Sequence, residues 1–317
     1  MAKVVVTGGA GLIGSHLCEE LLTQGHEVLC IDNLLTGQES NITPLESNTS
    51  FSFINFDVIN GLPEGIEFDA LFHLASPASP NHHSAISYHA LPMETMLVNT
   101  TGTMELLEAA KKQNAKFLFA STSEAYGDPE KHPQTEDYNG NVSTTGPRSV
   151  YDEAKRFGET ITAYYNRDQK VDVRIARIFN TYGPHMRTDD KRMIIDFITQ
   201  ALKGDAIPVF GNGSQTRSLC YVSDTVDGLI KLMFSDNTNG EVVNIGSIDE
   251  HTVMEYAEII KKLTNSSSEI TLSESLPKDD PLKRRPDIQK AKELIGWEPK
   301  VSLEEGLQKT IEYFKTL

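Results

Sequence analysis

The chain has few cysteines, no long apolar stretch and no obvious leader. Cys18, Cys30 and Cys220 are widely spaced and lie in apolar segments, so we expect buried free thiols in a reducing compartment rather than a disulfide framework. No apolar run approaches the roughly 20 residues of a membrane span, and Met1 leads directly into a strand-like segment. The sequence therefore predicts a cytoplasmic protein with no membrane partner.

Positive charge is also scarce. The 317 residues carry 29 Lys and Arg against 45 Asp and Glu, a net charge of −16, which argues against nucleic acid as a partner because phosphate neutralisation needs a basic face. An anionic ligand would need local cations, and several lie in predicted loops of the C-terminal half, where we expect a phosphate clamp. Solvated surface charge is the alternative. These cations are Arg187, Lys191, Arg192, Arg217, Lys283, Arg284 and Arg285.

A glycine-rich turn lies near the start of the chain. Residues 3–7 read as a buried strand and residues 15–24 as a helix, with Gly8, Gly11 and Gly14 between them. Such a turn lets the backbone approach a pyrophosphate at a helix N-terminus. A second strand ends at Asp32, where an acid accepts from an adenosine ribose and repels a 2′-phosphate, so the pattern predicts NAD rather than NADP. An ordinary turn with Asp32 as a helix cap is the alternative.

Further strands alternate with helical patterns along the first half of the chain. Because strands are predicted at 51–56, 70–74, 117–120 and 173–178, we expect an α/β fold, a Rossmann doubly wound parallel sheet with ligands at the carboxyl ends of its strands. Candidates for the adenine and nicotinamide-ribose surroundings follow two of these strands, and plain turn residues are the alternative. These candidates are Asp57, Val58, His73, Leu74, Ala75 and Ser76.

Two predicted helices have apolar residues at helical spacing, one at 94–112 and one around Tyr151. Both would lie on one face of the sheet. They could pack against the same helices of a second subunit, or within the monomer. We favour a homodimer.

Tyr151 and Lys155 are four residues apart, so on a helix their side chains share one face. A neighbouring ammonium favours the phenolate and is predicted to lower the pKa of Tyr151, making it a base near neutral pH. Thr122, at the end of an apolar strand, could hydrogen-bond the same substrate oxygen. The spacing alone is weak, because it arises by chance in many helices.

With the glycine turn, Thr122, Tyr151, Lys155 and the segment 176–184 in order, the chain resembles the extended short-chain dehydrogenase/reductase family of NAD-dependent nucleotide-sugar epimerases, dehydratases and decarboxylases. The resemblance covers essentially the whole chain. It implies an NAD-binding Rossmann domain at 1–179, also receiving part of 218–246, and a smaller C-terminal α/β domain at 180–317 that binds the UDP-sugar.

Within that family the chain is most similar to the UDP-glucuronate decarboxylases. Ser123-Glu124 stands where the family's 4,6-dehydratases carry Asp-Glu, and serine cannot protonate a departing hydroxyl near neutral pH. The stretches that carry this similarity are 73–80, 120–129, 151–156, 213–217 and 279–287.

The resemblance implies a mechanism in which Tyr151 takes the 4-hydroxyl proton while NAD takes the C4 hydride. The resulting 4-ketone lets carbon dioxide leave from C6, and NADH then returns the hydride, giving UDP-xylose. Glu124 would repel the substrate carboxylate or position a water that protonates C5. A UDP-sugar 4-epimerase, a variant that releases the 4-keto pentose, and a non-catalytic NAD sensor remain alternatives.

The resemblance also implies roles for individual residues. The catalytic candidates are Thr122, Ser123, Glu124, Tyr151 and Lys155. The cofactor-binding candidates are Gly8, Gly11, Leu12, Ile13, Gly14, Asp32, Asn33, Asp57, Val58, Leu74, Ala75, Tyr151, Lys155 and Ile178. The substrate-binding candidates are Ser76, Glu124, Asn180, Arg192, Val209, Phe210, Gln215, Arg217 and Arg284.

His185 and the pair His82-His83 stand out from the family pattern. His185 stands where the family often has Arg, so a phosphate or carboxylate contact could be weaker, pH-dependent, or taken over by Arg187 or Arg192. His82 and His83 lie in the loop expected over the sugar. Because no cysteine or carboxylate stands at ligand spacing beside them, we expect loop histidines and no metal site.

Overall fold

The computed structural model describes residues 1–276 and 281–317. Its centre is a seven-stranded sheet in the order β11-β6-β5-β4-β1-β2-β3, in which all neighbouring strands are parallel. The doubly wound parallel sheet predicted from the sequence is confirmed. The strands are β1 (Lys3–Thr7), β2 (Glu27–Asp32), β3 (Phe51–Asn55), β4 (Ala70–His73), β5 (Lys116–Thr122), β6 (Val173–Ile178) and β11 (Val242–Ile245).

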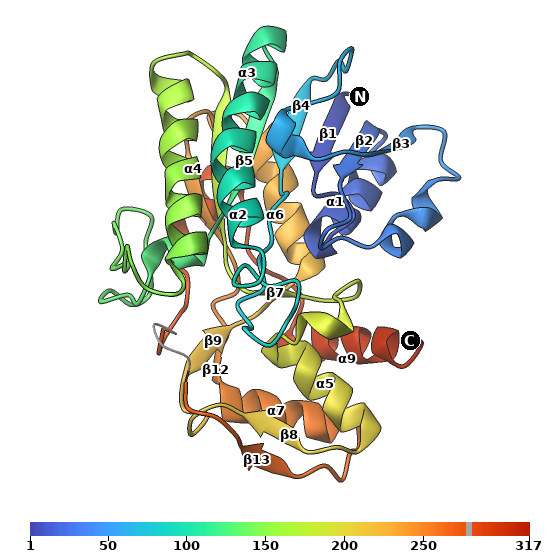
Figure 1. Ribbon diagram of the computed structural model, residues 1–317, viewed down its shortest axis with the longest axis vertical. Helices are drawn as coiled ribbons and strands as arrows, with labels where there is room; N and C mark the ends of the chain where they lie inside the picture. The colour runs from blue at the N-terminus through green and yellow to red at the C-terminus, as the bar shows by residue number, and fades with distance from the viewer. Residues whose placement is uncertain (277–280) are drawn as a thin grey trace.

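Helices cover both faces of the sheet (Figure 1). Side chains alternate along β1, so Val4 and Val6 join one hydrophobic cluster and Val5 the other. The first cluster includes α1 (Leu12–Thr23) and α6 (Val222–Phe234). The second includes α3 (Thr103–Gln113) and α4 (Ser149–Arg167). Burial on both faces explains the near-continuous apolar strands seen in the sequence.

The helix predicted over 94–112 is divided. It consists of α2 (Pro92–Leu97), one π-helical turn over Val98–Gly102, and then α3. A π turn inserts one residue into the helix and changes the facing of the side chains around it. In this turn Asn99 Nδ2 donates to Ser76 Oγ at 2.8 Å, which ties the helix to the strand end that carries Ser76.

The second region lies below the sheet in Figure 1. Three two-stranded sheets, β10-β7, β12-β9 and β13-β8, pack with α5, α7 and α9. The elements are β7 (Thr181–Tyr182), α5 (Met193–Lys203), β8 (Ile207–Val209), β9 (Thr216–Ser218), β10 (Cys220–Tyr221), β12 (Glu250–Thr252), α7 (Val253–Leu263), β13 (Ile270–Leu272) and α9 (Leu303–Phe314). The helix α8 (Gln289–Ile295) instead packs against β11 and α6 of the sheet region. Short 3₁₀ turns occur at Glu39–Asn41, Thr43–Leu45, Val58–Asn60, Ser123–Tyr126 and Thr188–Asp190.

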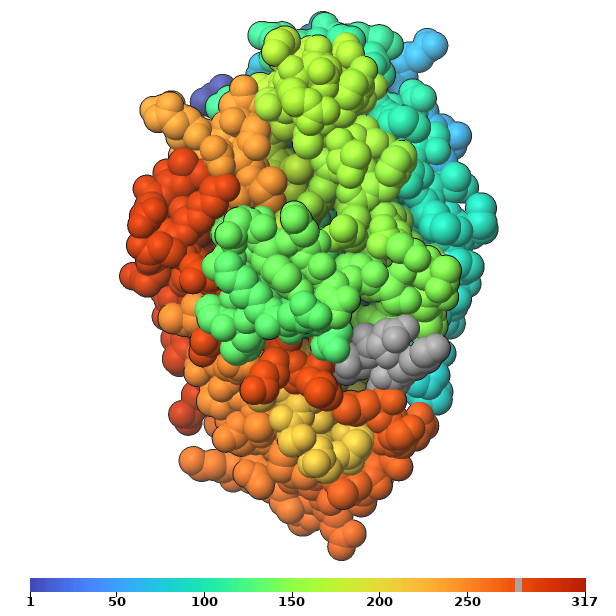
Figure 2. Space-filling model, turned by 90° about the vertical axis from the view of Figure 1, so that its left-hand side faces the viewer, coloured from blue at the N-terminus to red at the C-terminus, as the bar shows by residue number. Residues whose placement is uncertain are grey.

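The chain crosses between the two regions more than once. After β10 it returns to the sheet through α6 and β11, and Trp297, which is fully buried, donates its Nε1 hydrogen to the carbonyl of Asp224 in α6. Figure 2 shows the green segment before α4 covering the junction of the regions. There Gln134 N–H donates to Arg285 O at 2.9 Å, and Asp287 N–H donates to Gln134 O at 2.8 Å. The two regions are therefore joined by backbone hydrogen bonds.

The outer surface of α2, α3 and α4 carries several exposed apolar side chains. They are Met93, Leu97, Met104, Phe157 and Tyr164. Among the described residues, no helix has both the length and the apolar character needed to cross a membrane.

Candidate active site

A long pocket follows the carboxyl ends of the sheet strands and begins at the glycine turn. Gly8 has φ +73°, and a Cβ there would lie 2.6 Å from Ala75 N. A Cβ at Gly14 would lie 2.1 Å from Gly8 O. At Gly11, however, a Cβ would meet only Gly8 O, at 3.4 Å. The fold itself requires glycine at 8 and 14, whereas the bare Gly11 leaves room for a ligand at the backbone.

The N-terminus of α1 opens into this pocket. Gly11 is its N-cap, no side chain caps the helix, and no acidic residue lies in its first turn. The first N–H groups and the positive end of the helix dipole are thus available to an anion. Leu12, Ile13 and Gly14 of this turn line the pocket, as expected of residues that hold a pyrophosphate.

Asp32 lies at the end of β2 and is held by main-chain donors. Its carboxylate accepts from Ala10 N–H at 3.0 Å and from Leu34 N–H at 2.8 Å. Burial raises the pKa of this carboxyl, although the two backbone hydrogen bonds oppose the shift. The alternative role of Asp32 as a cap of the following helix does not apply, because its bonds go to the glycine turn and to the loop after β2.

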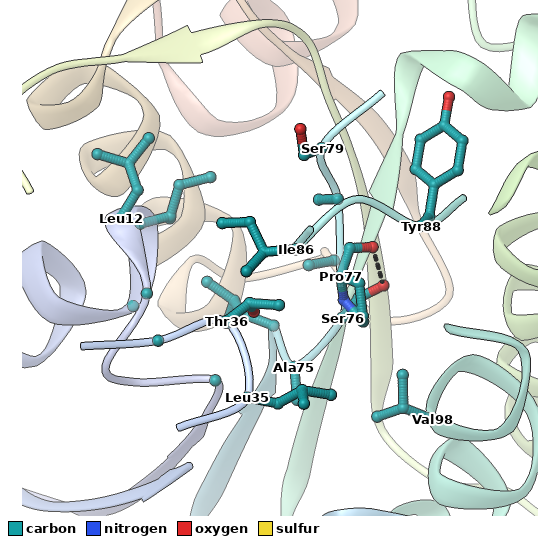
Figure 3. A pocket seen from close by; sticks show the side chains of 18 of the residues that line it. Leu12, Leu35, Thr36, Ala75, Ser76, Pro77, Ser79, Ile86, Tyr88 and Val98 are labelled. Carbon is teal, nitrogen blue, oxygen red and sulfur yellow. Dashed lines mark hydrogen bonds between the residues drawn. The ribbon is translucent and has the colours of Figure 1, made fainter. Parts of the chain in front are cut away.

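Every residue predicted to bind the cofactor lines this one pocket, as do the five catalytic candidates and four of the substrate candidates, Glu124 being in both of these sets. The cofactor set is Gly8, Gly11, Leu12, Ile13, Gly14, Asp32, Asn33, Asp57, Val58, Leu74, Ala75, Tyr151, Lys155 and Ile178, and the others are Thr122, Ser123, Glu124, Ser76, Asn180 and Arg192. Figure 3 shows Leu12 on one side of the pocket, Tyr88 and Val98 on the other, and Ile86 between them.

Tyr151, Thr122 and Lys155 meet at the centre of the pocket. Tyr151 and Lys155 lie one turn apart on α4, and the Thr122 side chain hydrogen-bonds Tyr151 from the end of β5. Lys155 Nζ donates to Ala120 O at 2.7 Å and lies 5.9 Å from the Tyr151 ring centroid. The predicted shared face is present, but the ammonium is fixed by the strand rather than bonded to the phenol.

The predicted lowering of the Tyr151 pKa is wrong for the site without ligands. Burial raises the pKa of Tyr151 to about 12, more than the Thr122 hydrogen bond lowers it. Burial also lowers the pKa of Lys155 to about 7, with Glu159 opposing that change. Desolvation outweighs the expected attraction because both side chains are almost completely buried.

Glu124 is clamped between two arginines. Arg148 Nη2 donates to one carboxylate oxygen at 2.6 Å, and Arg284 Nη1 donates to the other. Burial raises the pKa of Glu124, but the two guanidinium groups outweigh it and lower the pKa to about 2. Glu124 is therefore ionised and largely neutralised, which weakens the predicted repulsion of a substrate carboxylate.

Asp152 joins the same cluster from α4. It is 5 % exposed, and its Oδ1 has no hydrogen-bond partner among the described residues. Burial first, and then repulsion from Glu124, raise the pKa of Asp152 to about 7, although Arg148 and Arg284 oppose the shift. The cluster of Glu124, Asp152, Arg148 and Arg284 therefore holds two cations, one firm anion and one carboxyl that titrates near neutral pH.

Tyr88, which lines the pocket, and Arg148, which reaches it through Glu124, were both missed from the sequence. Tyr88 is almost fully buried and stacks on Tyr151, with ring centroids 4.9 Å apart and planes 10° from parallel. Arg148 is 6 % exposed at the N-cap of α4, where the helix dipole disfavours a cation. Because a cation is unfavourable at a helix N-terminus, Arg148 just before a predicted helix could have been recognised from the sequence as a candidate for a functional role. No local pattern pointed to Tyr88.

Several substrate candidates lie away from the pocket lining. Val209 is fully buried in β8 and its carbonyl accepts from Ser273 N–H at 2.9 Å. Gln215 Nε2 donates to Phe210 O at 3.1 Å, and Arg217 Nη1 donates to Thr216 O at 2.8 Å. Arg284 reaches the pocket only through Glu124. Asp279 and Asp280, part of a stretch that carried the resemblance, lie outside the described residues.

His185 lies at the cofactor end of the pocket. Its Nδ1 is 2.9 Å from Ser15 Oγ on α1, and its ring packs edge-on against His16, with centroids 4.4 Å apart. Burial lowers its pKa. Arg187 and Arg192 also line the pocket, but both are paired with aspartates, Arg187 with Asp189 and Arg192 with Asp190.

Residues 4–246 match the model of the NAD dependent epimerase/dehydratase family. The chain is 50% identical over 314 residues to "UDP-glucuronic acid decarboxylase 1" of Danio rerio, covering 98% of this chain and 72% of that protein. It is 48% identical over 314 residues to "UDP-glucuronic acid decarboxylase 5" of Arabidopsis thaliana, covering 99% of this chain and 89% of that protein.

A solved structure of similar shape is a UDP-glucuronic acid 4-epimerase from Bacillus cereus, in complex with UDP-glucuronic acid and NAD. It superposes with a TM-score of 0.87 at 31% identity and covers 99% of both chains. Sequence similarity thus points to decarboxylases, whereas this structural similarity includes an epimerase of the same sugar nucleotide.

Proposed function

Because the chain belongs to the NAD dependent epimerase/dehydratase family, we propose that it is a UDP-glucuronate decarboxylase, forming UDP-xylose and carbon dioxide with NAD recycled at the site. Identity of 48–50% to decarboxylases over nearly the whole chain supports this activity. The single structural observation that carries the proposal is the ionised Glu124 held by Arg148 and Arg284 in the same pocket as Thr122 and Tyr151.

The glycine turn and the β2 end fit NAD. Gly11 and the open N-terminus of α1 would hold the pyrophosphate, and Asp32 the adenosine ribose. Tyr151 and Lys155 lie where a nicotinamide ribose would meet β5. When bound, NAD supplies a hydride acceptor for C4 of the sugar and a positive charge beside Tyr151 and Lys155.

Tyr151 is the base for the 4-hydroxyl. Thr122 shares a hydrogen bond with its phenol and fixes where a substrate oxygen must sit, between the two side chains. Because burial keeps the pKa of Tyr151 high in the ligand-free site, the phenol gives up its proton only when positive charge is added nearby. Tyr151 therefore loses its proton only when NAD is bound and stays protonated in the ligand-free site.

Of the two roles considered for Glu124, we propose water positioning. Two arginines cancel most of its charge, so its repulsion of a substrate carboxylate is small. A carboxylate fixed by two guanidinium groups can still accept from a water and aim its proton at C5 after carbon dioxide leaves. Ser123, buried beside it, offers no acid for water elimination.

An NMR time course of the protein with NAD and UDP-glucuronate tests the activity. We expect UDP-xylose and one carbon dioxide per sugar consumed, with no accumulation of NADH. The 4-epimerase remains the second candidate because of the Bacillus cereus structure. Formation of UDP-galacturonate without loss of carbon would establish it and reject the decarboxylase. Release of a 4-keto pentose together with NADH would show that the hydride return fails.

We further propose a homodimer formed through α3 and α4. The supporting observation is the apolar outer surface on these helices and α2, where Met104 and Tyr164 line a shared hollow and Phe157 is 48% exposed. A second copy of the same two helices would cover it in a four-helix arrangement. Sedimentation should give a dimer for the parent chain and a monomer for Phe157→Glu with Tyr164→Glu, whereas exposed Leu282→Glu, elsewhere, should stay dimeric. A dimer retained in the double variant would reject this interface.

Two further proposals concern organisation and location. Residues 1–179 with part of 218–246 would form the NAD-binding domain, and the rest of 180–317 the UDP-sugar domain, because α6 and β11 lie in the sheet layer. A cytoplasmic location is supported by the three buried free thiols Cys18, Cys30 and Cys220. Domain-wise proteolysis and cell fractionation would test these two statements.

A further inference from the structure

The fold places a carboxylate beside the histidine pair of the loop after β4. His83 Nε2 lies 3.2 Å from Glu274 Oε1, and His82 Nε2 lies 3.8 Å from Glu274 Oε2. The two imidazole rings are 4.0 Å apart at their centroids. Glu274 follows β13, 191 positions along the chain from His83, so no local spacing could have revealed it. The three ligand atoms lie within 4.8 Å of one another.

Both sides of this cluster are anchored by hydrogen bonds. His83 N–H donates to Asn81 Oδ1 at 2.9 Å, which stabilises the backbone turn that carries the two histidines. Ser84 Oγ donates to Asp189 O at 2.8 Å. On the other side, the carbonyl of Glu274 accepts from Gly211 N–H at 2.7 Å. Backbone contacts therefore hold the two segments in place, in addition to the contact between His83 and Glu274.

We propose that His82, His83 and Glu274 bind a divalent transition metal ion of the Zn²⁺ class. Two imidazole nitrogens and one carboxylate oxygen are a common donor set for zinc, with water completing a tetrahedron. Bonds of about 2.0–2.1 Å at tetrahedral angles separate the ligand atoms by roughly 3.3 Å. Measured to one oxygen, Glu274 Oε2, the distances are 3.3 Å from His83 Nε2 and 3.8 Å from His82 Nε2, which are close to that value. With all three ligand atoms within 4.8 Å of one another, small side-chain movements would bring them around one ion.

The exposure of the cluster fits this role. The three side chains are 44–53% exposed, so an ion can enter and keep a water ligand, and small rotations of the side chains are unhindered. Mg²⁺ and Ca²⁺ prefer all-oxygen sites and are not expected to bind here. The site is selective for metals that accept imidazole.

An ion at this position would tie the pocket loop to the second region. Ser79, Ile86 and Tyr88 of the same loop line the pocket, whereas Glu274 belongs to the β8–β13 layer through Gly211. The ion would fasten the loop across the mouth of the pocket. Binding therefore stabilises the native state and slows the exchange of any ligand held beneath the loop.

Calorimetric titration of the tag-free 317-residue chain with ZnCl₂ tests the proposal. We expect one Zn²⁺ per chain, no response to MgCl₂, and a thermal midpoint that rises with zinc concentration. His83→Ala and Glu274→Gln should each weaken zinc binding at least about tenfold, because loss of a ligand should cost no less than loss of an outer-sphere contact. Both changes are at exposed positions and leave the fold intact.

His251→Ala is the matched control. His251 also lies beside two carboxylates, but Asp249 faces its Nε2 at 3.0 Å and Glu255 its Nδ1 at 4.0 Å, so these groups cannot gather around one ion. This variant should bind zinc like the parent chain. Absence of a one-to-one zinc site in the parent chain, or equal zinc affinity in the parent, His83→Ala and Glu274→Gln, would overturn the proposal.

Discussion

The cofactor end and the substrate end of the pocket differ in how they are built. At the cofactor end, all residues expected from the sequence line the pocket. At the substrate end, Ser76, Asn180 and Arg192 line it, whereas Val209, Phe210, Gln215 and Arg217 do not. The first end is made of strand ends and a glycine turn, and the second of loops that meet only in the folded chain. Local pattern therefore specifies the cofactor end far better than the substrate end.

The chemistry of the two ends differs in the same way. The cofactor end relies on backbone N–H groups and one carboxylate that itself bonds backbone donors. The substrate end relies on charged side chains that neutralise one another, Glu124 with Arg148 and Arg284. Backbone donors follow from the fold, whereas the charged cluster depends on residues up to 160 positions apart in sequence.

The largest expected effect on turnover is at Tyr151, which lies where the cofactor end and the substrate end of the pocket meet. Tyr151→Phe should reduce turnover at least about 10³-fold, since no other described side chain can take the 4-hydroxyl proton at that place. NAD binding should be retained, which separates chemistry from cofactor capture. Progress curves and NAD titration measure the two quantities.

Tyr88→Phe is the matched control for that variant. It keeps the stacked ring and removes a hydroxyl that has no hydrogen-bond partner among the described residues, so turnover should change only a few-fold. If Tyr88→Phe proved as inactive as Tyr151→Phe, the proton acceptor would have to be reassigned.

Two glycines of the cofactor end should separate stability from binding. Gly8→Ala puts a Cβ 2.6 Å from Ala75 N at a φ of +73°, and we expect a loss of about 2–4 kcal/mol in unfolding free energy. Gly11→Ala meets only Gly8 O at 3.4 Å and should unfold like the parent. Its methyl group should instead weaken NAD binding.

Urea unfolding and NAD calorimetry measure these two effects. Equal stability losses in the two variants would contradict the view that the fold requires Gly8 and the ligand requires Gly11. If Gly11→Ala bound NAD as tightly as the parent chain, the pyrophosphate would not bind at this turn.

At the substrate end, Glu124→Gln should slow decarboxylation about 10²-fold while C4 oxidation stays detectable as transient NADH. The amide keeps the shape of the side chain but loses the charge that holds Arg148 and Arg284 in place. Absorbance at the NADH band in single turnovers measures the oxidation, and carbon dioxide release measures the later step. Decarboxylation at the parent rate would mean that Glu124 neither positions a proton donor nor orients the arginines.

The sequence predicted the sheet because parallel strands buried on both faces have a strong apolar signature. It predicted the cofactor end because Gly8, Gly11, Gly14 and Asp32 keep fixed offsets from strand ends. It did not predict the π turn at 98–102, which depends on packing of Asn99 against Ser76. The spacing of apolar residues along a helix is too coarse to reveal the insertion of a single residue.

Prediction from the sequence failed where the effect of burial on a pKa was larger than the effect of a neighbouring charge. Spacing placed Lys155 near Tyr151 correctly, but the predicted direction of the Tyr151 pKa shift was wrong because desolvation is set by the whole fold. Arg148 and Arg284 converge on Glu124 from separate segments. Such clusters have no recognisable spacing in the sequence. The pKa values of their members can be assessed only when the folded structure is known.

The smallest expected effect concerns Asp152, the titrating member of the substrate-end cluster. Its pKa is raised from 3.8 to about 7, chiefly by burial, so the native state holds a proton that the unfolded chain releases near pH 4. Its contribution to stability is complete below pH 4 and is lost as the pH rises through 7. Over pH 5 to 7 the loss should be about 2 kcal/mol. The Asp152→Asn side chain is neutral at every pH, so between pH 5 and 7 this variant should lose about 2 kcal/mol less unfolding free energy than the parent chain in urea unfolding. The exposed control Asp137→Asn should lose as much as the parent over the same pH range. Parallel profiles for the parent and Asp152→Asn would show that Asp152 stays ionised, and the cluster would then carry no net charge for a uronate to meet.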